Sequence, residues 1–235
     1  NASGPAPKAL TPEFLAAKGV KTMPQSGIHS FTVPGAVDGW ARIHQRLGKL
    51  PWKDLFAPAI AYAEQGFPVT EIIGEIWNVA ENLKKIRVFP ESVRVFLPGG
   101  KPLHEGEVFK NPDVAHALRL IAEQGPDAFY KGEIATAILK TSQGFGGTMT
   151  AADLAGFSSE WVEPVSIDYR GWKVYELPPN SQGVAALEML NIMESCPLPD
   201  KLHASVDAWH WKIEAQKLAY QDLARSYPSQ VAVRI

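Results

Sequence analysis

The sequence lacks most of the features that mark a specialised structural class. It has a single cysteine, Cys196, among 235 residues, so no internal disulfide can form, and no CxxC or Cys/His pair suggests a zinc site. No apolar run approaches the roughly 20 residues that span a bilayer, and no charged start followed by an apolar stretch marks a signal peptide. We therefore expect no membrane span, and cysteine usage fits either a cytoplasmic or a periplasmic or secreted location.

An excess of charge of one sign is also missing. Lys and Arg number 23 against 25 Asp and Glu, which gives a formal net charge of -2, and the basic residues are scattered along the chain. Such a chain has no basic field for phosphates, so nucleic acid is not an expected partner. Apolar residues, in contrast, make up 46% of the sequence, which is enough for one or two solid cores.

Apolar residues recur at helical spacing over much of the chain, and many of these runs end at glycine. The spacing predicts helices over residues 12–18, 36–47, 51–66, 69–87, 111–122, 125–140, 182–193 and 205–224. Residues 89–109 hold three prolines and three glycines, which predicts a loop with short extended pieces. Thr150 followed by Asp153 predicts a capped helical turn.

Several of these helices carry large apolar side chains that we expect in the core. On the predicted 69–87 helix, one face collects Ile72, Ile73, Ile76 and Val79. Helical stripes also include five tryptophans, for which packing is favoured over ligand stacking: Trp40, Trp52, Trp77, Trp209 and Trp211.

Strand-forming residues gather only in the last third of the chain. Residues 162–169 and 172–177 flank Arg170-Gly171, which is a hairpin pattern. Two strands alone are too small a sheet to be stable, so their edges need partners. Either the helices of this chain cover the hairpin, or further strands come from chain outside this sequence; we predict the second. The fold class is then α+β.

The residues that carry chemistry do not form a recognisable active site. The six histidines lack HExxH or HxH spacing, so neither a metal site nor another cofactor is expected. The glycine-rich run at residues 144–147 lacks the strand before it and the GK[ST] ending of a phosphate-binding loop. No serine lies in a GxSxG motif, and Cys196 at a predicted helix end is interpreted as inert.

A series of short motifs resembles one known family. In chain order they are VPGAVDGW (33–40), GKLPW (48–52), APA (57–59), AEQGFPV (63–69), GPDAFYKG (125–132), DLAGF (153–157), YRGWKVY (169–175), LPPNSQG (177–183), MLNI (189–192) and EAQKLAY (214–220). Each block alone is weak evidence, but the ordered set is specific. Over residues 7–224 the sequence resembles the large subunit of the gamma-glutamyltranspeptidase family.

This resemblance implies a fold, a partner and a reaction. The family consists of N-terminal-nucleophile hydrolases with an αββα sandwich, made as a precursor that cuts itself into a large and a small subunit. Residues 1–235 would be part of the large subunit of a single two-subunit domain, supplying mainly helical layers and part of the sheet; the N-terminal region and the small subunit are absent. The nucleophile would be the first threonine of the small subunit, beyond Ile235, so this chain would hold no catalytic residue.

One departure from the family bears on the substrate. In the transpeptidases an arginine a few residues before an Ala-Pro pair grips the glutamyl α-carboxylate, whereas the aligned residues 1–7 contain no arginine. Ser3 lies there and cannot replace a bidentate guanidinium. Three functions remain open: cleavage of a gamma-glutamyl or related acyl amide, a cephalosporin (glutaryl) acylase-like amidase, and a non-catalytic helical scaffold. We expect Ser3 near the acyl group.

A second candidate position for substrate binding lies at Asn180 and Ser181. They precede the predicted 182–193 helix, whose free backbone amides could face the site. The alternative is an ordinary strand-to-helix turn in which Asn180 or Ser181 is a cap. A further departure is Leu223, where the family usually carries arginine.

Overall fold

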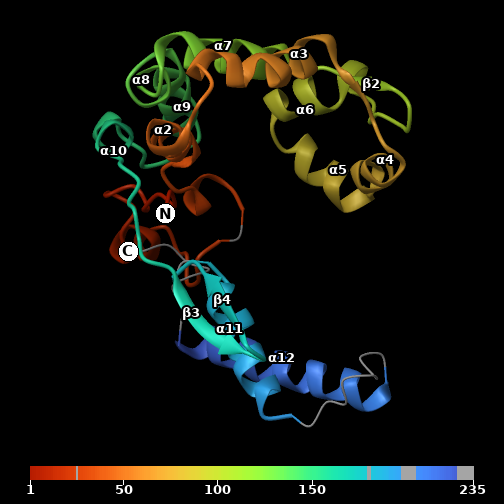
Figure 1. Cartoon of the computed structure of the whole chain (residues 1–235). Helices are drawn as coiled ribbons and strands as arrows, with labels where there is room; N and C mark the ends of the chain where they lie inside the picture. The colour runs from red at the N-terminus through yellow and green to blue at the C-terminus, as the bar shows by residue number, and fades with distance from the viewer. Residues whose placement is uncertain (25, 179–180, 197–204, 227–235) are drawn as a thin grey trace. The chain divides into compact units, whose positions relative to one another are not determined.

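The computed structural model describes residues 1–24, 26–178, 181–196 and 205–226. The chain divides into two compact units (Figure 1). The first contains Asn1–Arg42 and Ala137–Ile235, and the second contains Ile43–Thr136. None of the helices within the described ranges is long and apolar enough to cross a membrane.

The first unit begins with a short helix on its own small core. Thr11 caps helix α1 (Pro12–Ala17) by accepting a hydrogen bond from the Phe14 amide, and Pro12 is at the first helical position. The unit continues with η1 (Ile28–Ser30), α2 (Ala36–Leu47, which reaches into the second unit) and α9 (Glu133–Gly144, which begins there). Residues Ala6, Leu10 and Leu15 form the buried cluster beneath α1.

Helix α10 (Ala151–Ala155) is tied to the start of the chain by one carboxylate. Thr150 and Asp153 form a reciprocal capping box, as the sequence predicts. The second oxygen of Asp153 accepts the Lys8 amide at 3.1 Å. Asp153 is 7% exposed and its pKa is lowered: burial opposes ionisation, but the hydrogen bonds from the Thr150 side chain and from the Lys8 and Thr150 amides outweigh it.

The predicted hairpin is present, as strands β3 (Val165–Tyr169) and β4 (Trp172–Glu176). They pair antiparallel, with Tyr169 opposite Trp172, and the turn residues Arg170 and Gly171 have φ values of 50° and 82°. Two successive positive φ angles are the mark of a type I′ turn, which matches the strand twist. Helix α11 (Gly183–Glu194) packs on the hairpin and against α12 (Val206–Ser226), where Ala185, Ala219 and Leu223 are buried (Figure 1).

The second unit is helical apart from one short ladder. Its elements are η2 (Trp52–Phe56), α3 (Ala57–Gln65), β1 (Phe67–Pro68), α4 (Glu71–Asn78), α5 (Ala80–Arg87), α6 (Pro90–Phe96), η3 (Pro98–Gly100), β2 (Val108–Phe109), α7 (Pro112–Gln124) and α8 (Asp127–Tyr130). Helix α7 packs against α3 and η2, and the Trp52 indole donates to the Ile121 carbonyl at 2.9 Å. Strands β1 and β2 pair antiparallel, and the rings of Phe67 and Phe109 meet edge to face.

Three predictions about these helices are wrong in detail. The 69–87 helix breaks at Val79, whose ψ of 127° is extended, so two helices form there. Residues 89–109 are not a loop throughout, because Pro90 at a first helical position starts α6. The 125–140 helix is interrupted between Tyr130 and Glu133, which separates α8 from α9.

Burial also differs from the prediction. Ile72, Ile73, Ile76 and Val79 are exposed rather than buried, and so are Trp40, Trp209 and Trp211. Helical spacing identifies an apolar face, but it does not tell which chain covers that face. The fold class itself is confirmed: the chain is α+β, mostly helical with a small antiparallel hairpin.

We predict that replacing Asp153 with asparagine lowers the free energy of unfolding by about 1–2 kcal/mol at pH 7, because the donors on Lys8 and Thr150 lose a charged acceptor. A lowered folded-state pKa gives stability that is present above the unfolded value of 3.8 and is lost as the pH falls through the folded-state pKa. Urea unfolding at pH 7 and pH 3 measures this. The exposed Asp113→Asn is the control, and equal losses in both variants would contradict the assignment.

A second stability prediction concerns Glu188 on α11. Its Oε2 atom is buried without a hydrogen-bond partner, and its pKa is raised, first by burial and then by the Asp222 carboxylate on α12. Ionised Glu188 therefore costs stability above its unfolded pKa of 4.5, and this cost disappears below it. Glu188→Gln should raise the free energy of unfolding at pH 7 by about 1 kcal/mol.

The control for Glu188 is on the same helix. The Glu194 carboxylate accepts the Arg170 amide at 3.1 Å, so Glu194→Gln removes a partnered charge and should not stabilise the protein. Denaturant unfolding at pH 7 compares the two variants. Stabilisation by both, or by neither, would show that the orphan oxygen of Glu188 is not the cause.

Candidate functional site

The residue expected near the acyl group, Ser3, lies in a segment that is fixed on one side by close backbone approach. We call residues 1–5 the Ser3 segment. The Val33 amide donates to the Pro5 carbonyl at 2.9 Å. A Cβ added at Gly35 would lie 1.8 Å from the Ala2 carbonyl oxygen, so only glycine permits this approach. The Ser3 segment therefore lies directly against the start of α2.

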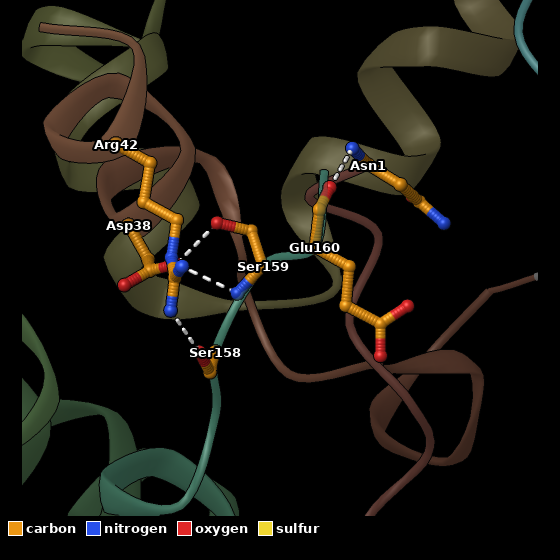
Figure 2. A network of polar contacts seen from close by, with 6 residues as sticks. All are labelled: Asn1, Asp38, Arg42, Ser158, Ser159 and Glu160. Atoms are coloured by element: carbon orange, nitrogen blue, oxygen red, sulfur yellow. Dashed lines mark hydrogen bonds and ion pairs between the residues drawn. The ribbon is translucent and has the colours of Figure 1, made fainter. Parts of the chain in front are cut away.

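The other side of the Ser3 segment pairs with the chain after α10. The Glu160 amide donates to the Asn1 carbonyl at 2.9 Å, and the Asn1 nitrogen donates to the Glu160 carbonyl at 2.7 Å (Figure 2). Two residues that exchange both bonds make the hydrogen-bonded pair of an antiparallel ladder. Asn1 also accepts the Ser3 amide through its side chain, at 3.1 Å. The backbone around Ser3 is held while its side chain is exposed.

One carboxylate organises the chain next to Glu160. Asp38, in the first turn of α2, accepts hydrogen bonds from both the amide (2.7 Å) and the hydroxyl of Ser159 (Figure 2). Arg42, one turn further on, pairs with the same Asp38 oxygen at 3.3 Å and also donates to the Ser158 hydroxyl. Ser159 is only 6% exposed.

This arrangement keeps Asp38 ionised. Burial alone would raise its pKa, but the hydroxyl and amide of Ser159 and the Arg42 guanidinium outweigh that effect, so the pKa is lowered. The result is an ionised carboxylate that is paired with Arg42 and holds Ser159. No described hydrogen bond reaches the Ser3 hydroxyl, so nothing in this part of the structure activates it as a nucleophile. A substrate contact of Ser3 stays a prediction.

The second predicted position is only partly described. Asn180 lies outside the described residues. The Ser181 hydroxyl donates to the Leu177 carbonyl and accepts from the Gly183 amide, both at 3.4 Å, which is a strand-to-helix turn before α11. The described residues show no hydrogen bond between Ser3 and Ser181. A substrate contact of Asn180 or Ser181 stays a prediction.

Other residue types that carry chemistry do not assemble. Within the described ranges, no three His, Cys, Asp or Glu side chains come together as a metal site requires. Cys196 is buried, and its thiol lies 3.4 Å from the Ile192 carbonyl. Leu223 is buried against Ala185 and Ala219, so its environment suits an apolar side chain.

Part of this site was accessible to sequence analysis, and part was missed. The VPGAVDGW block contains Gly35, Asp38 and Gly39, but residues 33–40 pointed only to a family, not to a contact with Ala2 or Ser159. Nothing in the local sequence indicates that Ser159 binds a carboxylate 121 positions away, or that the Ser158 hydroxyl accepts a hydrogen bond from Arg42. Only the fold brings them together.

Comparison with known proteins is consistent along the whole chain. The family model described as gamma-glutamyltranspeptidase matches residues 1–233. The glutathione hydrolase-like YwrD proenzyme of Bacillus subtilis is 38% identical over 223 residues, which cover 94% of this chain and 42% of that protein. The acylase ACY 1 proenzyme of Pseudomonas sp. strain SE83 is 36% identical over 89% of this chain and 37% of that protein. The chain thus spans about two fifths of these relatives.

Solved structures agree with this assignment. The cephalosporin acylase from Bacillus halodurans has a TM-score of 0.87 and 42% identity, over 94% of this chain and 42% of that one. The gamma-glutamyltranspeptidase of Helicobacter pylori has a TM-score of 0.84 and 30% identity, over 94% of this chain and 64% of that one. Both the sequence and the fold therefore lead to one conclusion: the chain belongs to the gamma-glutamyltranspeptidase family.

Proposed function

We propose that residues 1–235 are part of the large subunit of a precursor that cleaves itself and then acts as an amidohydrolase or acyltransferase. The observation that carries this proposal is the family match over residues 1–233, in a chain that spans only 42% of a relative named a proenzyme. The remaining length would hold the missing N-terminal region and the small subunit, whose first residue would be the nucleophilic threonine. The partners are that small subunit and an acyl amide, and no nucleic acid.

The chemistry follows from the properties of a free N-terminal threonine. Its α-amine has a pKa of about 8 and can accept the proton of its own hydroxyl. The hydroxyl then attacks the amide carbonyl, and backbone amides stabilise the oxyanion. When the tetrahedral intermediate collapses, the C–N bond breaks and the leaving amine takes the proton held by the α-ammonium group. The acyl-enzyme then passes its acyl group to water or to an acceptor amine. No histidine or metal is required, which fits the six histidines that form no triad or ligand motif in the sequence.

Exposed surface in the first unit supports a missing second subunit. Trp172 and Tyr175 on β4 are 76% and 58% exposed, although large aromatic side chains normally contribute to a core. Helix α12 buries its Ala208, Ala215 and Ala219 side but leaves Trp209 and Ile213 exposed. A hairpin of two strands is at best marginally stable by itself. We propose that strands from the small subunit and the absent N-terminal region extend it into the αββα sandwich.

The acyl donor is a gamma-glutamyl or related acyl amide, and a second candidate is a cephalosporin (glutaryl) acylase-like activity. The second candidate is favoured by the 42% identity of this chain to a cephalosporin acylase. Ser3 occupies the segment where the transpeptidases carry a carboxylate-binding arginine, and no arginine precedes Arg42, which bears on the carboxylate that both donors share. We expect a pocket that binds the acyl group through Ser3 and the segment around it rather than through a guanidinium.

Expression of the full-length precursor tests the reaction type. We expect spontaneous cleavage into two fragments that stay associated, with threonine at the start of the second, as N-terminal sequencing would show. Replacing that threonine with alanine should abolish both cleavage and release of chromophore from acyl anilides. A precursor that stays intact and inactive would instead support the non-catalytic scaffold.

The donor is tested with three anilides. Gamma-glutamyl and glutaryl anilides share a terminal carboxylate and differ in the α-amine, and butyryl anilide has neither group. We expect the wild-type enzyme to have a higher kcat/KM for the glutaryl than for the gamma-glutamyl compound; the reverse preference would contradict the acylase-like assignment.

The Ser3→Arg variant should gain a guanidinium that binds the carboxylate of the acyl donor. Because a bidentate guanidinium binds a carboxylate strongly, kcat/KM for both carboxylate donors should rise about tenfold relative to butyryl anilide. Ser3→Gln, a long but uncharged side chain, is the control. If neither variant changes the ratio, or both change it equally, Ser3 does not lie near the acyl carboxylate.

A further inference from the structure

We propose that Asp38 is a positioning residue that sets the affinity for the acyl donor by fixing the Ser3 segment. The inference rests on the proposed function, since it concerns the same substrate site. Asp38 has no described hydrogen bond to the segment itself. Its contribution passes through Ser159 and Glu160 to Asn1 (Figure 2). From Asn1 it reaches the Ser3 amide.

The first step is that three hydrogen-bond donors share one carboxylate oxygen of Asp38. Asp38 Oδ2 accepts from the Ser159 amide, the Ser159 hydroxyl and Arg42. A buried amide that loses its acceptor pays the full desolvation cost, because water cannot replace the partner at a position that is 6% exposed. Removal of the Asp38 charge must therefore shift Ser159 rather than leave it in place.

The second step is the direct continuity from Ser159 to the Ser3 segment. Glu160 is the next residue, and both of its backbone groups pair with Asn1, so a shift of Ser159 moves this pair. Asn1 in turn holds the Ser3 amide through its side chain. Ser3 itself lies between two fixed points, the Asn1–Glu160 pair and the hydrogen bond from Val33 to Pro5.

The third step is that residues at the start of α2 contribute to the fixation of the Ser3 segment on both of its sides. Gly35 and Gly39 lie on either side of Asp38 in the sequence. A Cβ added at Gly35 would lie 1.8 Å from the Ala2 carbonyl oxygen, and a Cβ added at Gly39 would lie 2.8 Å from the Ala2 Cβ. The two glycines allow the Ser3 segment to lie close to the start of α2 on one side. On the other side, Asp38 holds Ser159, which is next to the residue that pairs with Asn1. The position of Ser3 is thus determined by the first turn of α2, and a loss of Asp38 loosens it without removing any group that touches substrate.

The test uses the processed full-length enzyme carrying Asp38→Asn. An asparagine keeps the shape but loses the charge and presents an amide that cannot accept all three donors. We expect KM for the preferred anilide to rise about tenfold while kcat changes less than twofold, since a disordered binding segment weakens ground-state and transition-state binding alike. Ser159→Ala, which keeps the amide bond to Asp38, should raise KM by a smaller factor, and Asp38→Glu should recover part of the loss.

A structural readout separates this inference from the proposed function. In hydrogen exchange, the Glu160 and Ser3 amides should exchange about tenfold faster in Asp38→Asn than in the wild type, because their acceptors are on the released Asn1. This arm needs no substrate. If the wild-type enzyme cleaves no acyl amide but the exchange changes, the proposed function fails and the positioning role stands.

The matched control lies in the second unit. Asn111 caps α7 by accepting the Val114 amide at 3.1 Å, so Asn111→Ala removes a comparable hydrogen bond that involves none of residues 1–5 and 158–160. It should lower stability while leaving KM and the exchange at Ser3 unchanged. Equal KM increases in Asn111→Ala and Asp38→Asn, or no KM increase in Asp38→Asn, would overturn the proposal.

Discussion

The carboxylate of Asp38 is the interaction on which the organisation of the candidate site depends. It joins the first turn of α2 to Ser159, which is far away in sequence and precedes the residue that pairs with Asn1, while Arg42 on the same helix donates to Ser158. Because the carboxylate accepts several hydrogen bonds, its pKa is lowered and the charge persists at neutral pH. A similar device recurs at Asp153, which links α10 to Lys8. Two half-buried or buried carboxylates thus hold the first ten residues on the first unit.

These anchors matter because the beginning of the chain has no regular structure of its own. Residues 1–10 belong to no helix or strand, and their positions come from backbone hydrogen bonds, glycine contacts and a small apolar cluster at Ala6 and Leu10. A segment of this kind has little intrinsic preference for one conformation, so its order must be imposed by neighbours. The same property makes it suitable for substrate binding, since side chains on it can change without disturbing a helix or strand.

Sequence analysis was most successful where local signals are strong. The Thr150–Asp153 capping box of α10 and the Arg170-Gly171 turn of the hairpin follow from short patterns and are present. It failed at the Val79 break, where no glycine or proline marks the end of a helix. It also could not find the Asp38–Ser159 contact, because a carboxylate and a serine separated by 121 positions leave no periodic trace. The family resemblance located the block but not its bonds.

The apolar faces wrongly predicted to be buried and the missed Asp38–Ser159 contact share a physical cause, because both depend on parts of a protein that are distant in sequence. Ile72, Ile73, Ile76 and the β4 aromatics are exposed, and helical or strand spacing does not tell which part of a protein covers an apolar face. The Ser3 segment shows the opposite case: hydrogen bonds within this chain hold its backbone, while the exposed Ser3 side chain makes no described hydrogen bond. The segment is therefore anchored by atoms other than the Ser3 side chain, so the residue at position 3 can differ without loss of these hydrogen bonds.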